Sequence, residues 1–231
     1  MQITTISFFR FSGWGNRFWA LSQMGLAPMR LGTVQGLQFI KFLGSGAENG
    51  FSIKANWGVY GILAIWDTEA SAVTFFSENP VFQGYKAHST TFQTIFLQNT
   101  MAHGQWDGLT PFQSGAPFDL LAPVAVITRA TIKTKYLVRF WRKVPSVSKA
   151  VEERPGLRFA VGIGELPLIQ QATFSVWDTG KQMIDYAYKG DHHKGVIQQT
   201  RELGWYKEEL FARFVPYKME GHGFVPELNL L

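Results

Sequence analysis

The sequence contains no cysteine, and this absence excludes several classes of protein at once. Without thiols the chain forms no disulfide framework, holds no iron–sulfur cluster, and offers neither a cysteine nucleophile nor a thiolate ligand to a metal. Charge is also scarce: charged residues make up 17% of the chain, and the net charge of +5 comes from scattered basic residues. We therefore expect no nucleic-acid binding and favour attraction to an acidic membrane surface.

Long apolar runs and targeting signals are missing as well. No stretch of about 18 apolar residues, the length a membrane-spanning helix needs, occurs in the sequence. The N-terminal residues MQITTISFFRF have neither a basic start nor a small-residue cleavage site. The expectation is a cytoplasmic protein that is soluble or peripheral to the membrane.

The familiar motifs of phosphate, nucleotide and hydrolase chemistry are absent too. The sequence has no Gly-x-Gly-x-x-Gly, no Gly-Lys-Ser/Thr, no Gly-x-Ser-x-Gly and no His-Glu-x-x-His. Aromatic residues, by contrast, reach 15% of the 231 residues, with 20 Phe and 8 Trp. That content is ample for a packed core and also suits a wide apolar cavity.

Two strings recur in the same order along the chain. Gly36-Leu37-Gln38-Phe39 returns 120 positions later as Gly156-Leu157-Arg158-Phe159, and Ile65-Trp66-Asp67-Thr68 returns 111 positions later as Val176-Trp177-Asp178-Thr179. His103-Gly104 and His222-Gly223 form a third, weaker pair. The difference in spacing predicts about nine extra residues in the first half, which we place in an exposed glycine-rich loop over residues 44–50. The pattern indicates an internal duplication.

Each half has the same expected order of elements. A strand leads into a helix, two strands follow, then a helix that begins after Asp67-Thr68 or Asp178-Thr179, and a last strand. This β-α-β-β-α-β order is the ferredoxin-like unit. We predict an α+β fold of two ferredoxin-like halves, residues 1–109 and 118–231, joined by a linker over 110–117 and forming a pseudo-twofold, barrel-like pair.

An additional helix is expected in the second half. Asp191 can cap it, and His193 shares one helical face with four residues further along, Val196, Ile197, Thr200 and Leu203. His193 should therefore point inward, either as a hydrogen-bonded core residue or as a ligand, whereas His192 is turned by about 100°. Beyond the helix, Glu208-Glu209 is expected to be solvated, and Arg213 and Phe214 should face opposite sides of a strand.

Several longer strings together resemble the spheroidene monooxygenase family, the acyclic-carotenoid 2-ketolases. They are Ser7-Phe8-Phe9-Arg10-Phe11, residues 16–27 (NRFWALSQMGLA), Gly36-Leu37-Gln38-Phe39 with Gly44-Ser45-Gly46, residues 170–177 (QQATFSVW), and the segment from Ala187-Tyr188 through His193 to Phe214. The resemblance extends from about Thr5 to about Gly223. It departs from the family pattern at Gly190-Asp191-His192-His193, where a second histidine stands beside the first.

The resemblance implies a monooxygenase with haem b that uses dioxygen and external electrons on an acyclic carotenoid or similar apolar molecule. Haem iron then takes His193 as its axial ligand, with His192 and His88 as alternatives. Arg201 and Arg213 are the candidate partners of the haem propionates. Arg129 is either a polar donor on the dioxygen side or a structural ion-pair partner.

The expected partners follow from the same resemblance. They are an apolar substrate, an electron donor such as a reduced ferredoxin, a peripheral membrane contact and a second copy in a homodimer. Two other functions stay open: a non-catalytic protein that binds haem or an apolar ligand, and a haem-dependent dehydratase or peroxygenase on the same fold.

Overall fold

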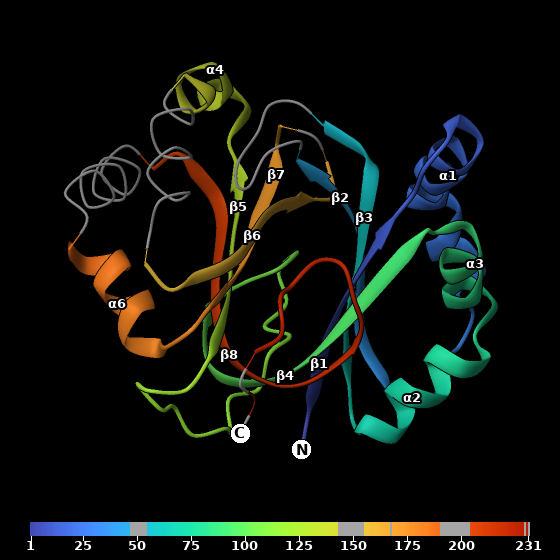
Figure 1. The fold of residues 1–231 in the computed structure, drawn as a ribbon. Coiled ribbons are helices and arrows are strands. Elements are labelled where there is room, and N and C mark those ends of the chain that lie inside the picture. Colours follow the sequence, from blue (N-terminus) through green and yellow to red (C-terminus); the bar gives the residue numbers. More distant parts are fainter. Residues whose placement is uncertain (47–54, 143–154, 167, 190–203, 229, 231) are drawn as a thin grey trace.

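Eight strands of the described residues close into one antiparallel barrel. A computed structural model describes residues 1–46, 55–142, 155–166, 168–189, 204–228 and 230. Around the barrel the strands follow the order β1-β3-β2-β6-β7-β5-β8-β4 (Figure 1). Each neighbouring pair in this order is hydrogen-bonded, so the sheet has no free edge.

The elements of the first half are β1 (Ile3–Arg10), α1 (Trp14–Arg30), β2 (Leu37–Gly46), β3 (Ala55–Trp66), α2 (Glu69–Glu78), α3 (Pro80–His88) and β4 (Thr91–Gly104). Those of the second half are β5 (Val124–Ile132), a short 3₁₀ turn (Thr134–Tyr136), α4 (Leu137–Trp141), β6 (Leu157–Gly164), β7 (Gln170–Trp177), α6 (Gly180–Lys189) and β8 (Tyr206–Gly221). In Figure 1, α1, α2 and α3 lie along one side of the barrel, and α6 lies on the opposite side.

The internal duplication is confirmed by strand order and register. Within the barrel the halves run β4-β1-β3-β2 and β8-β5-β7-β6, which is the same ferredoxin-like order twice. Trp66 lies opposite Ile3, just as Trp177 lies opposite Val124. Because β2 pairs with β6 and β4 pairs with β8, equivalent strands of the two halves meet at both seams.

The recurring strings occupy equivalent places in the two halves and form equivalent hydrogen bonds. The backbone N–H of Asp67 donates to the carbonyl of Gly36 at 2.9 Å, and that of Asp178 donates to the carbonyl of Gly156 at 2.8 Å. Thr68 and Thr179 each accept a backbone N–H three residues ahead with their hydroxyl oxygens, as predicted for helix caps.

Two details differ from expectation. The weaker histidine pair is out of register: Gly104 and Gly221, each at the end of its strand, are the equivalent residues, so His103 and His222 do not correspond. Residues 44–46 belong to β2 rather than to a loop, because Ser45 pairs with Asn56 across the hairpin. The two proposed halves form one barrel, in line with the predicted barrel-like pair. The boundaries of the halves and of the linker over 110–117 stay a prediction.

Gly36 provides a stability test of the shared turn. Its φ of 74° is left-handed, and an added Cβ would lie 2.3 Å from Asp67 Oδ1 and 2.6 Å from Ser71 Cβ. Gly32 has a similar φ of 65° but open space around it. Gly36→Ala should therefore cost about 3 kcal/mol in unfolding free energy and Gly32→Ala about 1 kcal/mol, measured by urea denaturation. Equal losses of unfolding free energy in the two variants would show that the close approach of residue 36 to Asp67 does not contribute to the loss.

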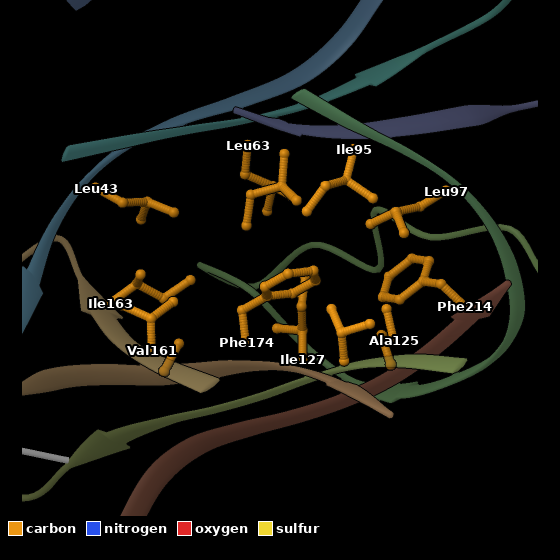
Figure 2. Close-up of a cluster of buried hydrophobic side chains, with 14 of the residues drawn as sticks. Leu43, Leu63, Ile95, Leu97, Ala125, Ile127, Val161, Ile163, Phe174 and Phe214 are labelled. Atoms are coloured by element: carbon orange, nitrogen blue, oxygen red, sulfur yellow. The ribbon is translucent and has the colours of Figure 1, made fainter. Parts of the chain in front are cut away.

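The interior of the barrel is filled by side chains of both halves. Figure 2 shows these residues meeting between the strands of the two halves, among them Leu43, Leu63, Ile95, Leu97, Ile127, Val161, Phe174 and Phe214. One end is closed by Trp106 and Arg129, the other by the segment after β8, where Gln93 accepts the N–H groups of Phe224 and Val225. An elongated ligand therefore has to bind outside this core.

Candidate cofactor site

The outer face of the barrel is covered by large side chains in the first half. Phe9 of β1 contacts the rings of Phe82 and Tyr85 on α3, with centroids 5.4 and 5.1 Å apart. The buried cluster beneath α1, α2 and α3 also includes Phe11, Phe42, Tyr60, Ile62, Trp66, Phe75, Phe76 and Phe96. These side chains are buried between the sheet and its helices.

The equivalent face of the second half carries much smaller side chains. Because the two halves share strand order and register, each position can be matched to its counterpart. The matched pairs are Phe9 and Ala130, Phe42 and Gly162, Tyr60 and Gln171, Ile40 and Ala160, and Ile62 and Thr173. We call the small residues of this face the floor: Thr128, Ala130, Ala160, Gly162, Thr173 and Ser175.

Exposure differs between the two faces at two matched positions, although Ala160 and Gly162 of the floor are themselves buried. Ser7 is 1% exposed, whereas its counterpart Thr128 is exposed. Ile62 is 2% exposed, whereas its counterpart Thr173 is half-buried. Five pairs of matched positions therefore lose side-chain volume in the same direction, and a flat apolar group is the ligand shape that such a surface accommodates.

A cation and several aromatic rings border the floor. Arg213 of β8 lies opposite Val126, donates from Nε to Thr100 Oγ1 at 3.0 Å, and places its guanidinium carbon 3.4 Å from the ring centroid of Phe118. Phe214 is fully buried in the barrel, so the predicted opposite orientation of these two neighbours is confirmed. Phe211, which lies opposite Thr128, stacks on the exposed ring of His103.

The other predicted site residues fall in two groups. His193, His192 and Arg201 lie outside the described residues, in the segment between α6 and β8. His88 lies on α3 in the first half, stacked on Trp19 at 3.9 Å with its Nδ1 2.9 Å from the carbonyl oxygen of Gly84. His88 therefore belongs to the filled face and not to the floor. Among the described residues, no group of three or more His, Asp or Glu side chains is placed to hold a metal ion.

Arg129 has a structural role inside one end of the barrel. Its side chain is 1% exposed and forms ion pairs with Glu208, with Asp107 at 2.9 Å and with Glu165 at 3.5 Å. Lys41 joins the same network through Asp107 and through Glu165 at 2.7 Å. The ion-pair interpretation of Arg129 thus fits the structure, and Glu208, expected to be solvated, is a partner in this network instead.

The pKa of Glu208 reflects this environment. Burial alone would raise it, but hydrogen bonds from the backbone N–H groups of Gly108 and Asp107, together with Arg129, lower the pKa overall. A carboxyl whose folded-state pKa is lowered stabilises the fold above its ordinary pKa of about 4.3. That contribution is lost as the pH falls through the lower, folded-state value.

Removing Arg129 should be strongly destabilising near neutral pH. Arg129→Met leaves three carboxylates around Lys41 alone and should cost about 3 kcal/mol in unfolding free energy at pH 7. Arg158→Met, which breaks the exposed pair with Asp178, is the matched control and should cost less than about 1 kcal/mol. The deficit of Arg129→Met should shrink below about pH 4, because protonation relieves the unpaired carboxylates. A deficit that grows on acidification would contradict this account.

Two clefts elsewhere in the described residues do not match an apolar cofactor. One of about 600 Å³ at the end of the barrel is lined by charged and polar groups including Asp107, Lys207 and Glu208. The other, of about 430 Å³, has a mixed lining in which Arg158, Asp178 and Glu227 stand beside Leu121 and Leu228. The floor is therefore the better candidate for a flat apolar ligand.

Comparison with known proteins identifies the family. No family model matches the chain. The spheroidene monooxygenase of Rhodobacter capsulatus is 39% identical over 223 residues, which cover 96% of this chain and 92% of that protein. This chain belongs to the spheroidene monooxygenase family. The identification confirms the predicted resemblance and, with it, the prediction of a monooxygenase-type oxidoreductase.

Two further spheroidene monooxygenases are similar to this chain in sequence. The protein of Cereibacter sphaeroides is 38% identical over 93% of this chain, and the chain spans 66% of the length of that relative. The protein of Rubrivivax gelatinosus is 34% identical over 80% of this chain and 71% of its own length.

Solved structures support the fold alone. A crystal structure of aldoxime dehydratase matches with a TM-score of 0.63 at 10% identity, covering 93% of this chain and 81% of that one. A second, aldoxime dehydratase in complex with butyraldoxime, matches with a TM-score of 0.60 at 11% identity, covering 97% and 83%. The duplicated barrel thus recurs in solved proteins of very different sequence.

Proposed function

We propose that this chain is a haem-dependent monooxygenase that forms a ketone next to the chain end of an acyclic carotenoid or a similar apolar molecule. Family membership supports the reaction class, and the names of the relatives support the carotenoid. The observation that carries the haem is the floor, where small side chains replace the large ones of the first half. Haem, when bound, supplies the activation of dioxygen with electrons from an external donor.

The floor fits haem b in shape and chemistry. Its flat, small-residue surface accepts a planar macrocycle, and the rings of Phe211 and Phe118 provide apolar contacts at its border. We assign Arg213 to a haem propionate, because its guanidinium lies at the rim and a charge-assisted hydrogen bond to a carboxylate is strong. Arg201 is the second proposed propionate partner.

His193 is the proposed axial ligand of the iron. In the first half, the chain that follows α2 continues into α3, which packs on Phe9. The chain that follows α6 starts from the equivalent place in the second half and carries His193 within a few residues. On this symmetry we propose His193 as the ligand of the second half, whereas His88 belongs to the filled face of the first half.

The remaining partners are proposed on chemistry. Dioxygen is the co-substrate, and a reduced ferredoxin or similar donor supplies the electrons. We further propose a cytoplasmic location with a peripheral membrane contact, because a carotenoid dissolves in lipid and the chain is positively charged. A homodimer remains part of the proposal. No helix within the described ranges is long and apolar enough to cross a bilayer.

Absorbance of the purified protein tests the proposal first. A Soret band should persist through gel filtration after haem is added, and turnover of an acyclic carotene should then require both dioxygen and a reductant. Retained haem without turnover would favour the non-catalytic binding protein. Turnover with peroxide in place of dioxygen and reductant would favour the peroxygenase.

A further inference from the structure

The solvent-facing side of α1 is apolar along its length. Four large hydrophobic side chains on this helix are exposed: Trp14 by 89%, Phe18 by 74%, Leu21 by 41% and Met29 by 74%. Their spacing of three, four and eight residues places all four on one helical face. We call these four residues the α1 stripe.

The opposite face of α1 accounts for its packing on the barrel. Ala20, Gln23 and Ala27 are its buried residues, and they lie about half a turn away from the α1 stripe. The helix contacts β2, β3 and α3 through this side. The helix is anchored by these residues and by Trp19, which packs on Tyr85 and His88, so its exposed large side chains have no part in holding it to the barrel.

The charge around the α1 stripe has one sign. The first 47 residues contain no Asp or Glu, and Arg17 and Arg30 of α1 are exposed. In Figure 1, α1 lies at the periphery of the molecule, on the side away from β5 and α6. An exposed apolar row of this kind on a monomer marks an interaction surface.

We propose that the α1 stripe docks the protein on a membrane rich in anionic lipid. Trp and Phe are the residues that settle at the level of the headgroups, and flanking arginines attract anionic lipid. The helix has 17 residues, so it presents a ridge about 25 Å long that can lie flat in the interface. This inference specifies the membrane contact of the proposed function, and binding can be measured without haem or turnover.

A vesicle-binding assay tests the proposal. Wild-type protein at low salt should float with vesicles that contain phosphatidylglycerol and bind much less to pure phosphatidylcholine. The double variant Trp14→Ser/Phe18→Ser should reduce the partition coefficient by at least about tenfold, because two large apolar side chains no longer enter the lipid. Leu121→Ser, at a residue 76% exposed outside α1, is the matched control and should bind like wild type.

A second measurement distinguishes docking of the α1 stripe on a membrane from docking on a second copy of the chain. Sedimentation of wild type and of the double variant, without vesicles, should give the same oligomeric state. Loss of a dimer in the double variant, or vesicle binding equal to that of wild type, would overturn the proposal. Failure of turnover with intact vesicle binding would instead count against the proposed function and leave the docking surface standing.

Discussion

His193→Ala should abolish the Soret band of the haem-loaded protein, whereas His192→Ala should leave it nearly intact. An imidazole is a standard axial donor to haem iron, and the chain has no thiolate to replace it. Removing the axial ligand leaves only apolar contacts and propionate pairs to hold the cofactor. The measurement is absorbance after gel filtration, with haem content per chain determined in parallel.

The two neighbouring histidines serve as each other's control. Far-ultraviolet circular dichroism should show the same fold for both variants. Loss of the Soret band in His192→Ala alone would move the ligand to His192. Normal spectra in both variants would remove this segment as the source of the ligand and bring back His88, despite its stacking on Trp19.

Ala130→Phe should strongly weaken haem binding while the barrel stays folded. The substitution introduces the side chain that Phe9 places at the equivalent position of the first half, so it fills the floor with a ring. Haem affinity should fall by about a hundredfold, because overpacking costs on the order of 3 kcal/mol. The measurement is haem titration followed by the Soret band.

The control for this variant adds the same ring elsewhere on the surface. Val73→Phe on α2 is suitable, because Val73 is 43% exposed and lies on the filled half. It should bind haem like wild type. Unchanged haem affinity in Ala130→Phe would place the cofactor away from the floor, even if the His193 variant behaved as expected.

The sequence contained enough information to predict the duplicated fold. Trp66 and Trp177 recur at the same point of each half, and each sits at the end of an equivalent strand because the turn after it needs the same glycine and cap. The register of the last strands is harder to predict: a two-residue His-Gly string is too short to fix it, and the equivalent glycines are Gly104 and Gly221.

The candidate site was only partly predictable. The opposite orientations of Arg213 and Phe214 are predictable, since neighbouring residues of a strand lie on opposite sides. The floor is not predictable from composition. A small residue such as Ala130 or Thr173 indicates open space only once it is compared with its large counterpart in the other half. Aligning the halves strand by strand would have revealed it. The partners of Arg129 come from three separate segments, and no local pattern joins them.

The central claim is that this chain uses haem and dioxygen to oxidise an acyclic carotene. The most direct measurement is mass analysis of the product formed by haem-loaded protein with an acyclic carotene and a reductant, with and without dioxygen. The account predicts a product in which one oxygen replaces two hydrogens next to the chain end, formed only when haem, reductant and dioxygen are all present. The same product formed equally by protein without haem, or no oxidised carotene despite bound haem and an active electron donor, would contradict it.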